Sequence, residues 1–451
     1  YGLRWETQNE IQDKSDWAPR VYLAYALGHG KHKPKTVIRA GYGWFYERFT
    51  VPNGSYGTPY IISTIHNNLP TVPGQLSNQQ IYTVTDPTGY TETSPGNAVK
   101  PPNPTSSNSA PTYSTLDPNF RSALDMQAAI GIDHQFAKNI TGNVTYLDSR
   151  GIHQYLTNNI TAPFFDGKSN IYPTAPLTPP DTNNNQYQSG GVYRENQVIA
   201  TMNVRLKNLS LFTNYTFTNA KADTNSVSQT PFNASDPGQD YGRARFDRRN
   251  RFMLFGNINL PYAISFAPFL VYNGGNPFNI TTGSDLTGNN AFNSRPTYAT
   301  SCSETGAVQT RYGCLNPNPV GTNEKIIPYN LGNGPSSISL NLRVGKTIGF
   351  GPKLKSGVNT GGGGDHGGRH GGGLRGGLSG GGQSGPGRLD KGVPRKYNLT
   401  LSAFSTNVLN HENLGQPNGI LTSPLFGKSQ SVAGGFFGGY RQIFLNASVS
   451  F

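Results

Sequence analysis

The chain has 451 residues, enough for two or three ordinary domains, but only 34% of them are hydrophobic, which supplies a single large soluble core poorly. Its formal net charge of +13 is spread over a charged fraction of only 14%, so composition argues against a nucleic-acid partner. No run of about 18 apolar residues is present, which excludes a transmembrane helix.

The residue types favour strands and turns over helices. The chain has 24 Tyr and 23 Phe against 3 Met, together with 56 Gly and 33 Pro. It starts at Tyr1, not at Met, and already inside a strand-like pattern, so we expect it to be a fragment of a longer protein. Alternation of apolar and polar residues predicts about twelve strands, over residues 1–8, 18–27, 35–47, 122–137, 139–150, 195–207, 209–218, 247–260, 263–279, 336–349, 395–410 and 440–451.

The connections between these strands have two lengths, short and long, which alternate along the chain. Tight turns such as those at 137–139, 207–208 and 261–263 alternate with long stretches rich in Asn, Pro, Gly, Ser and Thr. The long stretches are 48–121, 151–194, 219–246, 280–335 and 411–439. In an antiparallel meander every second connection lies at the same end, so all long loops are expected at one end of the sheet.

This asymmetry is typical of outer-membrane barrels, which have long loops outside the cell and short turns in the periplasm. Lipid requires every backbone N–H and C=O of a spanning segment to be satisfied without water, which a closed sheet achieves. The pattern therefore predicts an all-β fold, a transmembrane antiparallel β-barrel over 1–451, with apolar side chains facing lipid. A soluble β-sandwich shares the alternation but gives no reason for the two loop lengths.

Residues 357–392 interrupt the pattern with a glycine-rich insert where a short periplasmic turn is expected. Such a segment cannot bury enough surface to offset its ordering entropy, so we expect a flexible basic loop. His366 and His370 within it lack carboxylate partners and rigidity, which favours a solvated linker over a metal site.

Two cysteines, Cys302 and Cys314, lie in the long stretch 280–335. A nearby pair in a loop outside the cell predicts a disulfide that stabilises by about 3 kcal/mol through loop closure. A metal pair would need closer spacing and further ligands.

The segment "YGRARFDRRNRF", residues 241–252, holds five arginines at the outer end of a strand. One interpretation is a site for phosphates of outer-leaflet lipopolysaccharide or for an anionic ligand. The favoured interpretation is an arginine network within the barrel wall, with Asp240 and Asp247 as partners.

No nucleophile with a base, paired carboxylates or phosphate-binding loop rises above chance, so the sequence predicts neither an enzyme nor a cofactor.

Several stretches in a fixed order resemble the C-terminal barrel of TonB-dependent outer-membrane transporters, especially the Oar-like group. They are "APRVYLAYAL", "KTVIRAGYGWFYER", "QAAIGIDHQFAKNITGNVTYLDSRGIH", "DRRNRFMLFGNINLP", "NGGNPFNITTGSDLTG" with "SRP" at 294–296, "YNLTLSAFSTNVLNHENLG" and "SPLFGKS". The resemblance implies a 22-stranded barrel with an N-terminal plug and a box that contacts TonB. The present strands would then be the last twelve, with about ten strands, plug and box missing.

The terminal strand resembles the family's signal for the barrel-assembly machinery, carried here by Tyr440, Leu445, Val449 and Phe451. The resemblance implies a receptor in the bacterial outer membrane that binds a substrate with its outer loops and imports it with energy from the inner membrane. Membrane lipid, lipopolysaccharide and TonB would be its partners. A structural or adhesive barrel, a porin without energy coupling and a secreted soluble β-sandwich binding protein are the alternatives. The substrate, oligomeric state and role of the insert are not predicted.

Overall fold

A computed structural model describes residues 1–8, 11, 13–28, 34–49, 62–65, 79–83, 112–166, 171–173, 175–180, 182–353, 395–433 and 439–451. Within these ranges the helical segments are two 3-10 turns, Pro237–Asp240 and Pro261–Ala263. None of the described residues forms a helix long and apolar enough to cross a membrane. The glycine-rich insert 357–392 lies outside the described residues.

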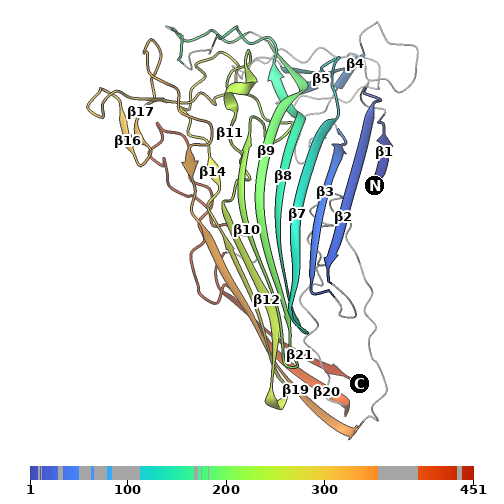
Figure 1. Cartoon of the computed structure of the whole chain (residues 1–451). Coiled ribbons are helices and arrows are strands. Elements are labelled where there is room, and N and C mark those ends of the chain that lie inside the picture. Colours follow the sequence, from blue (N-terminus) through green and yellow to red (C-terminus); the bar gives the residue numbers. More distant parts are fainter. Residues whose placement is uncertain are drawn as a thin grey trace.

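Twelve strands form a continuous antiparallel wall in the order β1-β2-β3-β7-β8-β9-β10-β12-β13-β19-β20-β21 (Figure 1). Their bounds are β1 Gly2–Glu6, β2 Asp16–Leu27, β3 Thr36–Glu47, β7 Ala123–Ala137, β8 Ile140–Asn159, β9 Asn183–Arg205, β10 Leu209–Ala222, β12 Asn250–Leu260, β13 Ile264–Asn273, β19 Ser337–Lys353, β20 Arg395–Thr406 and β21 Gln442–Ser450. The predicted all-β antiparallel wall of about twelve strands is confirmed.

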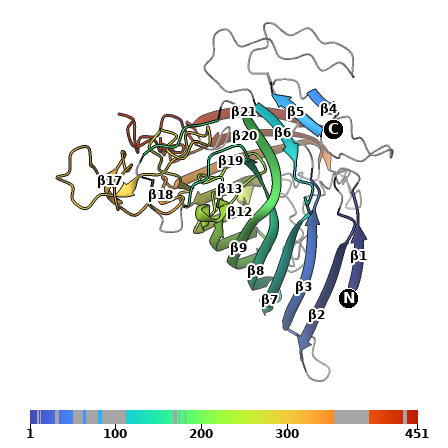
Figure 2. The ribbon, with the colours of Figure 1, turned by 90° about the horizontal axis from the view of Figure 1, so that it is seen from above.

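Seen from above, the wall follows an arc with β1 and β21 at its two ends (Figure 2). Within the described part of the chain, each of these two strands pairs on one side only. The curvature is that of a barrel wall, because each strand is rotated relative to its neighbour.

One face of the wall is an apolar surface whose register continues across nine strands. A single row of directly paired positions holds Tyr25, Ile38, Ile132, Val144, Ala200, Tyr215, Phe252, Tyr272 and Ile338. Four side chains of this row are exposed, with Val144 54% and Ile132 51% accessible, and the others are half-buried. No second sheet covers these residues in the described structure, which disagrees with a soluble sandwich and agrees with a surface made for lipid.

The opposite, inner face is polar and hydrogen-bonded. Asn143 and Thr145 of β8 are both buried there. The Asn143 amide donates to Asp133 Oδ1 of β7 at 2.7 Å, and the Thr145 hydroxyl donates to Asn143 Oδ1 at 3.0 Å. These side-chain hydrogen bonds pair the buried polar groups on the concave side of the wall.

The connections divide between two ends of the wall, here called the loop end and the turn end. The turn end holds the tight β7–β8, β9–β10 and β12–β13 connections. The described parts of the β8–β9, β10–β12, β13–β19 and β20–β21 connections lie at the loop end (Figure 1).

Two predicted long loops are shorter than expected. The stretch 151–194 contributes to both β8 and β9, which stay paired as far as Asn159 and Asn185. Register shifts near Gly151 and Gln154 let the ladder continue beyond the alternating segment. The stretch 219–246 likewise contributes the end of β10 and the two-residue strand β11 (Gly242–Arg243). These extensions carry polar residues without alternation, so hydrophobic periodicity did not predict them.

Further short strands lie within the predicted long loops. The stretch 48–121 contains β4 (Ile62–Ile65), β5 (Gln79–Thr83) and β6 (Thr112–Leu116), and β6 pairs in parallel with the extended part of β9. The stretch 280–335 contains β15 (Thr297–Tyr298), β16 (Val308–Thr310), β17 (Gly313–Asn316) and β18 (Gly332–Asn333), the last pairing with β14 (Pro277–Phe278).

Candidate functional site

The long loops fold against one another into one body at the loop end. We call the described residues of segments 160–182, 223–249, 274–336 and 407–433 the loop cap. One of its buried clusters joins three of these segments through Phe165, Tyr172, Phe232 and Ile326. The rings of Tyr172 and Phe232 meet edge to face with centroids 5.7 Å apart. Residues far apart in the sequence therefore share one core.

A second cluster joins the segment after β13 to the segment before β21. Phe278, Ile280, Leu315 and Ile327 pack with Leu421. Backbone hydrogen bonds also join the two segments, since Thr281 N–H donates to Gly419 O at 2.9 Å and Leu421 N–H donates to Thr281 O at 2.8 Å. The loop cap thus includes the last long loop.

A buried ion pair lies beside the aromatic cluster. Arg295 Nη2 is 3.4 Å from Asp240 Oδ1, and their side chains are 2% and 3% exposed. The guanidinium lies over the Phe232 ring at 4.8 Å and also donates to Gln239 O at 3.1 Å. Burial raises the pKa of Asp240, and the positive charge of Arg295 opposes that rise. The pair ties the segment before β12 to the segment after β13.

The arginine-rich segment 241–252 forms a network around Asp247. The fully buried Asp247 accepts from Arg243 Nε at 2.8 Å and Arg249 Nε at 3.2 Å, and from the Ala220 N–H at 3.0 Å. The predicted pairing of arginines with Asp247 is therefore confirmed, although Asp247 lies in the loop cap and not in the barrel wall. The predicted pairing is wrong for Asp240, whose ion-pair partner is Arg295, because loop folding brings in a residue from a distant segment.

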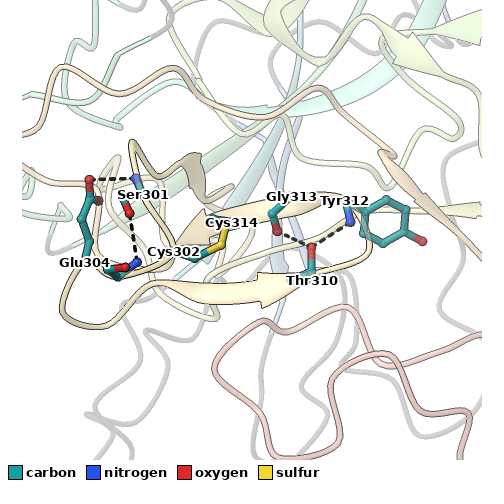
Figure 3. The surroundings of a disulfide bond; sticks show 8 residues. Ser301, Cys302, Glu304, Thr310, Tyr312, Gly313 and Cys314 are labelled. Carbon is teal, nitrogen blue, oxygen red and sulfur yellow. Dashed lines mark hydrogen bonds between the residues drawn. A yellow bond between two sulfur atoms is a disulfide. The ribbon is translucent and has the colours of Figure 1, made fainter.

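A disulfide joins Cys302 to Cys314, with their Cα atoms 5.1 Å apart (Figure 3). Cys314 lies in β17, which pairs with β16 and β15. The turn is closed by Thr310, whose hydroxyl donates to Gly313 O at 2.8 Å and accepts from Tyr312 N–H at 3.0 Å. The adjacent Leu315 is fully buried in the second cluster, so the disulfide braces a hairpin anchored in the loop cap.

A separate polar cavity of about 390 Å³ lies at the loop end near β2 and β8. Its lining includes Asp16, Phe120, Arg121, Ser122 and His153. The Ser122 hydroxyl donates to Asp16 Oδ2 at 2.6 Å, and the His153 backbone has φ of 57° where the β8–β9 register shifts. The cavity combines both charge signs, which suits a polar ligand.

The four residues predicted to carry the assembly signal fall on or beside β21. Leu445 and Val449 lie opposite Ala403 and Leu399 of β20, and they are 83% and 60% exposed. Tyr440 precedes the strand and Phe451 follows it. The structure thus places an exposed apolar row on the terminal strand.

The site residues that sequence reasoning missed are Arg295, Tyr172 and Phe232. Only Arg295 left a signal, as part of the "SRP" stretch noted for its resemblance. Among the described residues, no group of three or more His, Cys, Asp or Glu side chains could hold a metal ion. The loop cap is a folded body whose buried charge pair holds two of its segments together.

The geometry defines an antiparallel membrane-barrel wall with a folded cap of loops. The profile of the outer membrane beta barrel domain family matches residues 6–353, so the chain belongs to that family. The predicted outer-membrane location is confirmed by this match.

Solved structures that are similar to this chain include a mutant of the Pseudomonas aeruginosa ferric enterobactin receptor in complex with enterobactin, at 10% identity over 99% of this chain and TM-score 0.46. The outer membrane transporter YddB from Escherichia coli matches 92% of this chain at 9% identity and TM-score 0.41. The P. aeruginosa ferripyoverdine receptor matches 98% at 10% identity and TM-score 0.39. This chain covers 42%, 38% and 33% of those chains, in the same order. No curated protein matches the sequence.

Proposed function

We propose that this chain is the barrel-wall portion of a TonB-dependent receptor that binds a substrate at its loop end and passes it through the barrel. The observation that carries the proposal is the loop cap, where segments from four connections share buried clusters and the Asp240–Arg295 pair. An ordered cap positions contact residues without a large ordering cost on binding. The resemblance of the sequence stretches to Oar-like transporters adds support and suggests a large or oligomeric substrate.

The test is uptake by cells. Cells that express the whole gene product are compared with isogenic cells lacking the gene or lacking TonB, using labelled iron chelates, peptides and oligosaccharides. Loss of uptake of one probe in both deletions supports the proposal. Uptake that needs the gene but not TonB indicates a porin, and unchanged uptake with lost surface adhesion indicates a structural or adhesive barrel.

Membrane assembly is proposed to begin with recognition of β21 by the barrel-assembly machinery. The support is its exposed alternating face and terminal aromatic residue. Deleting Phe451 should lower the amount of protein in the outer membrane while leaving synthesis unchanged. Equal membrane levels would contradict this role.

A further inference from the structure

Three exposed basic side chains lie directly opposite one another across three neighbouring strands. Arg150 of β8 pairs with Arg194 of β9, and Arg194 pairs with Lys221 of β10. All three are exposed, and the Arg194 side chain is 64% accessible. We call these three residues the basic row.

The basic row is on the same outer face as the apolar belt. Counting toward the turn end, the next row is Asp148, Asn196 and Asn219, and the row after it is Tyr146, Val198 and Phe217. The basic row therefore follows an apolar row containing two aromatic rings by four residues, or about 14 Å along the strands. The apolar belt, the aromatic residues, a row of two amides and one carboxylate, and the cations follow one another as polar and aromatic residues do across a membrane interface.

Like charges directly opposite one another on a sheet repel, so an anion bound beside the basic row would stabilise it. Its one ion-pair contact is Arg194 Nη2 to Asp148 Oδ2 at 3.7 Å, between side chains that are both accessible. In the described part of the chain, no carboxylate lies within ion-pair distance of Arg150 or Lys221. The wall supplies less negative charge than these three cations would attract.

Two arginines of the segment 241–252 are less available to such an anion. Arg243 lies opposite Lys221, but its guanidinium is bonded to the buried Asp247, as is that of Arg249. The charges of these two arginines are thus balanced by Asp247, whereas the basic row on the neighbouring wall has a single long ion-pair contact.

We propose that the basic row binds the phosphate groups of an outer-leaflet lipid headgroup. Headgroups extend about 5–7 Å beyond the hydrocarbon on each side. Strand tilt shortens the 14 Å separation along the membrane normal, and long cationic side chains can bend toward phosphates. The positive charge of the basic row and its position beyond the apolar belt together favour a membrane lipid as the ligand over a soluble anion.

The proposal is tested by titrating the detergent-purified whole protein with bisphosphorylated lipid A and measuring the bound fraction by native mass spectrometry. A variant combining Arg150→Gln, Arg194→Gln and Lys221→Gln should bind about 100-fold more weakly, at about 1 kcal/mol per cation near anionic headgroups. The charge-preserving variant Arg150→Lys/Arg194→Lys should keep most of the affinity.

A matched control removes three cations from the turn end of the same strands: Lys138→Gln, Arg205→Gln and Lys207→Gln, all at exposed positions. This variant should bind lipid A within about threefold of the unaltered protein. Equal losses in the two triple variants would overturn the proposal, as would equal binding of dephosphorylated lipid A. Full competition by millimolar inorganic phosphate would identify a soluble-anion site and also overturn it. Retained far-ultraviolet circular dichroism verifies that each variant is folded.

Discussion

The wall and the loop cap use apolar side chains in opposite ways. On the wall, Ile132 and Val144 face outward and are more than half exposed, whereas in the loop cap Ile280 and Leu315 are 0% exposed. The wall keeps its polar residues on the concave side, and the loop cap buries a charged pair among aromatic rings. The wall therefore presents its apolar side chains to lipid, whereas the loop cap buries its apolar side chains in a core of its own.

Because of this difference, the wall and the loop cap should lose their structure independently of each other. Wall stability depends on backbone ladders and on the fit of its outer face to lipid. Cap stability depends on packing between loops and on one desolvated ion pair. Substitutions in one region should leave the other folded.

The largest expected effect comes from Arg295→Met, which leaves Asp240 as an uncompensated buried carboxylate. Breaking such a pair costs about 3–5 kcal/mol. Hydrogen exchange should rise in segments 223–249 and 290–333 and stay unchanged in the wall. The double variant Arg295→Met/Asp240→Asn should recover part of the loss.

The control applies the same substitution to a more exposed ion pair. Arg4 is 2.7 Å from Glu6 with a side chain 58% exposed, so Arg4→Met should cost less than about 1 kcal/mol. Equal losses from Arg4→Met and Arg295→Met would show that burial is not the cause.

Next in size is Val144→Arg, which places a charge on the outer face within the belt. A cation near the middle of a barrel's lipid face costs about 2–4 kcal/mol and near the interface about 0–1 kcal/mol. Asn219→Arg, two rows nearer the loop end, should therefore be nearly neutral. Denaturant unfolding in lipid vesicles measures both, and similar costs would contradict the membrane depth assigned to these rows.

Removing the disulfide with Cys302→Ser/Cys314→Ser should have a smaller effect that stays local. Opening a loop of this length costs up to about 3 kcal/mol, less where the hairpin has its own anchors. Here Leu315 supplies such an anchor. Limited proteolysis should cut the hairpin faster while the wall stays protected. Faster cutting throughout the cap would show that the disulfide braces more than the hairpin.

The smallest expected effect is a pH dependence from Asp223, a loop residue just after β10. Burial raises its pKa from a usual 3.8 to about 6, against the opposing hydrogen bond from the Val192 N–H. A raised carboxyl pKa contributes stability that is present below about pH 4 and lost as pH rises through 6. Asp223→Asn should remove this loss, so the thermal unfolding temperature should change less between pH 4 and 7 than in the unaltered protein. An unchanged pH profile would contradict the assignment to Asp223.

Sequence patterns predicted the wall far better than the loop cap. Alternation located β7, β12 and β21 to within a few residues, because each has one face in contact with a different solvent. It did not predict the ends of β8 and β9 or the parallel β6, because their residues do not alternate. There Leu116, Tyr155 and Tyr187 pack against Phe49 and Phe120, which come from distant segments. The Asp240–Arg295 pair was also missed, because no local spacing in the sequence predicts a contact between residues 55 positions apart.

By itself the sequence determined which residues form strands, which side of each strand is apolar and how long and short connections alternate. These features follow from a two-residue repeat between hydrocarbon and a polar interior, which is a local property of the chain. The tertiary structure decided which loops pack together, which acid meets Arg295 and how three cations align across β8, β9 and β10. Those choices depend on strand register and on contacts between distant segments, and neither is encoded in a local pattern.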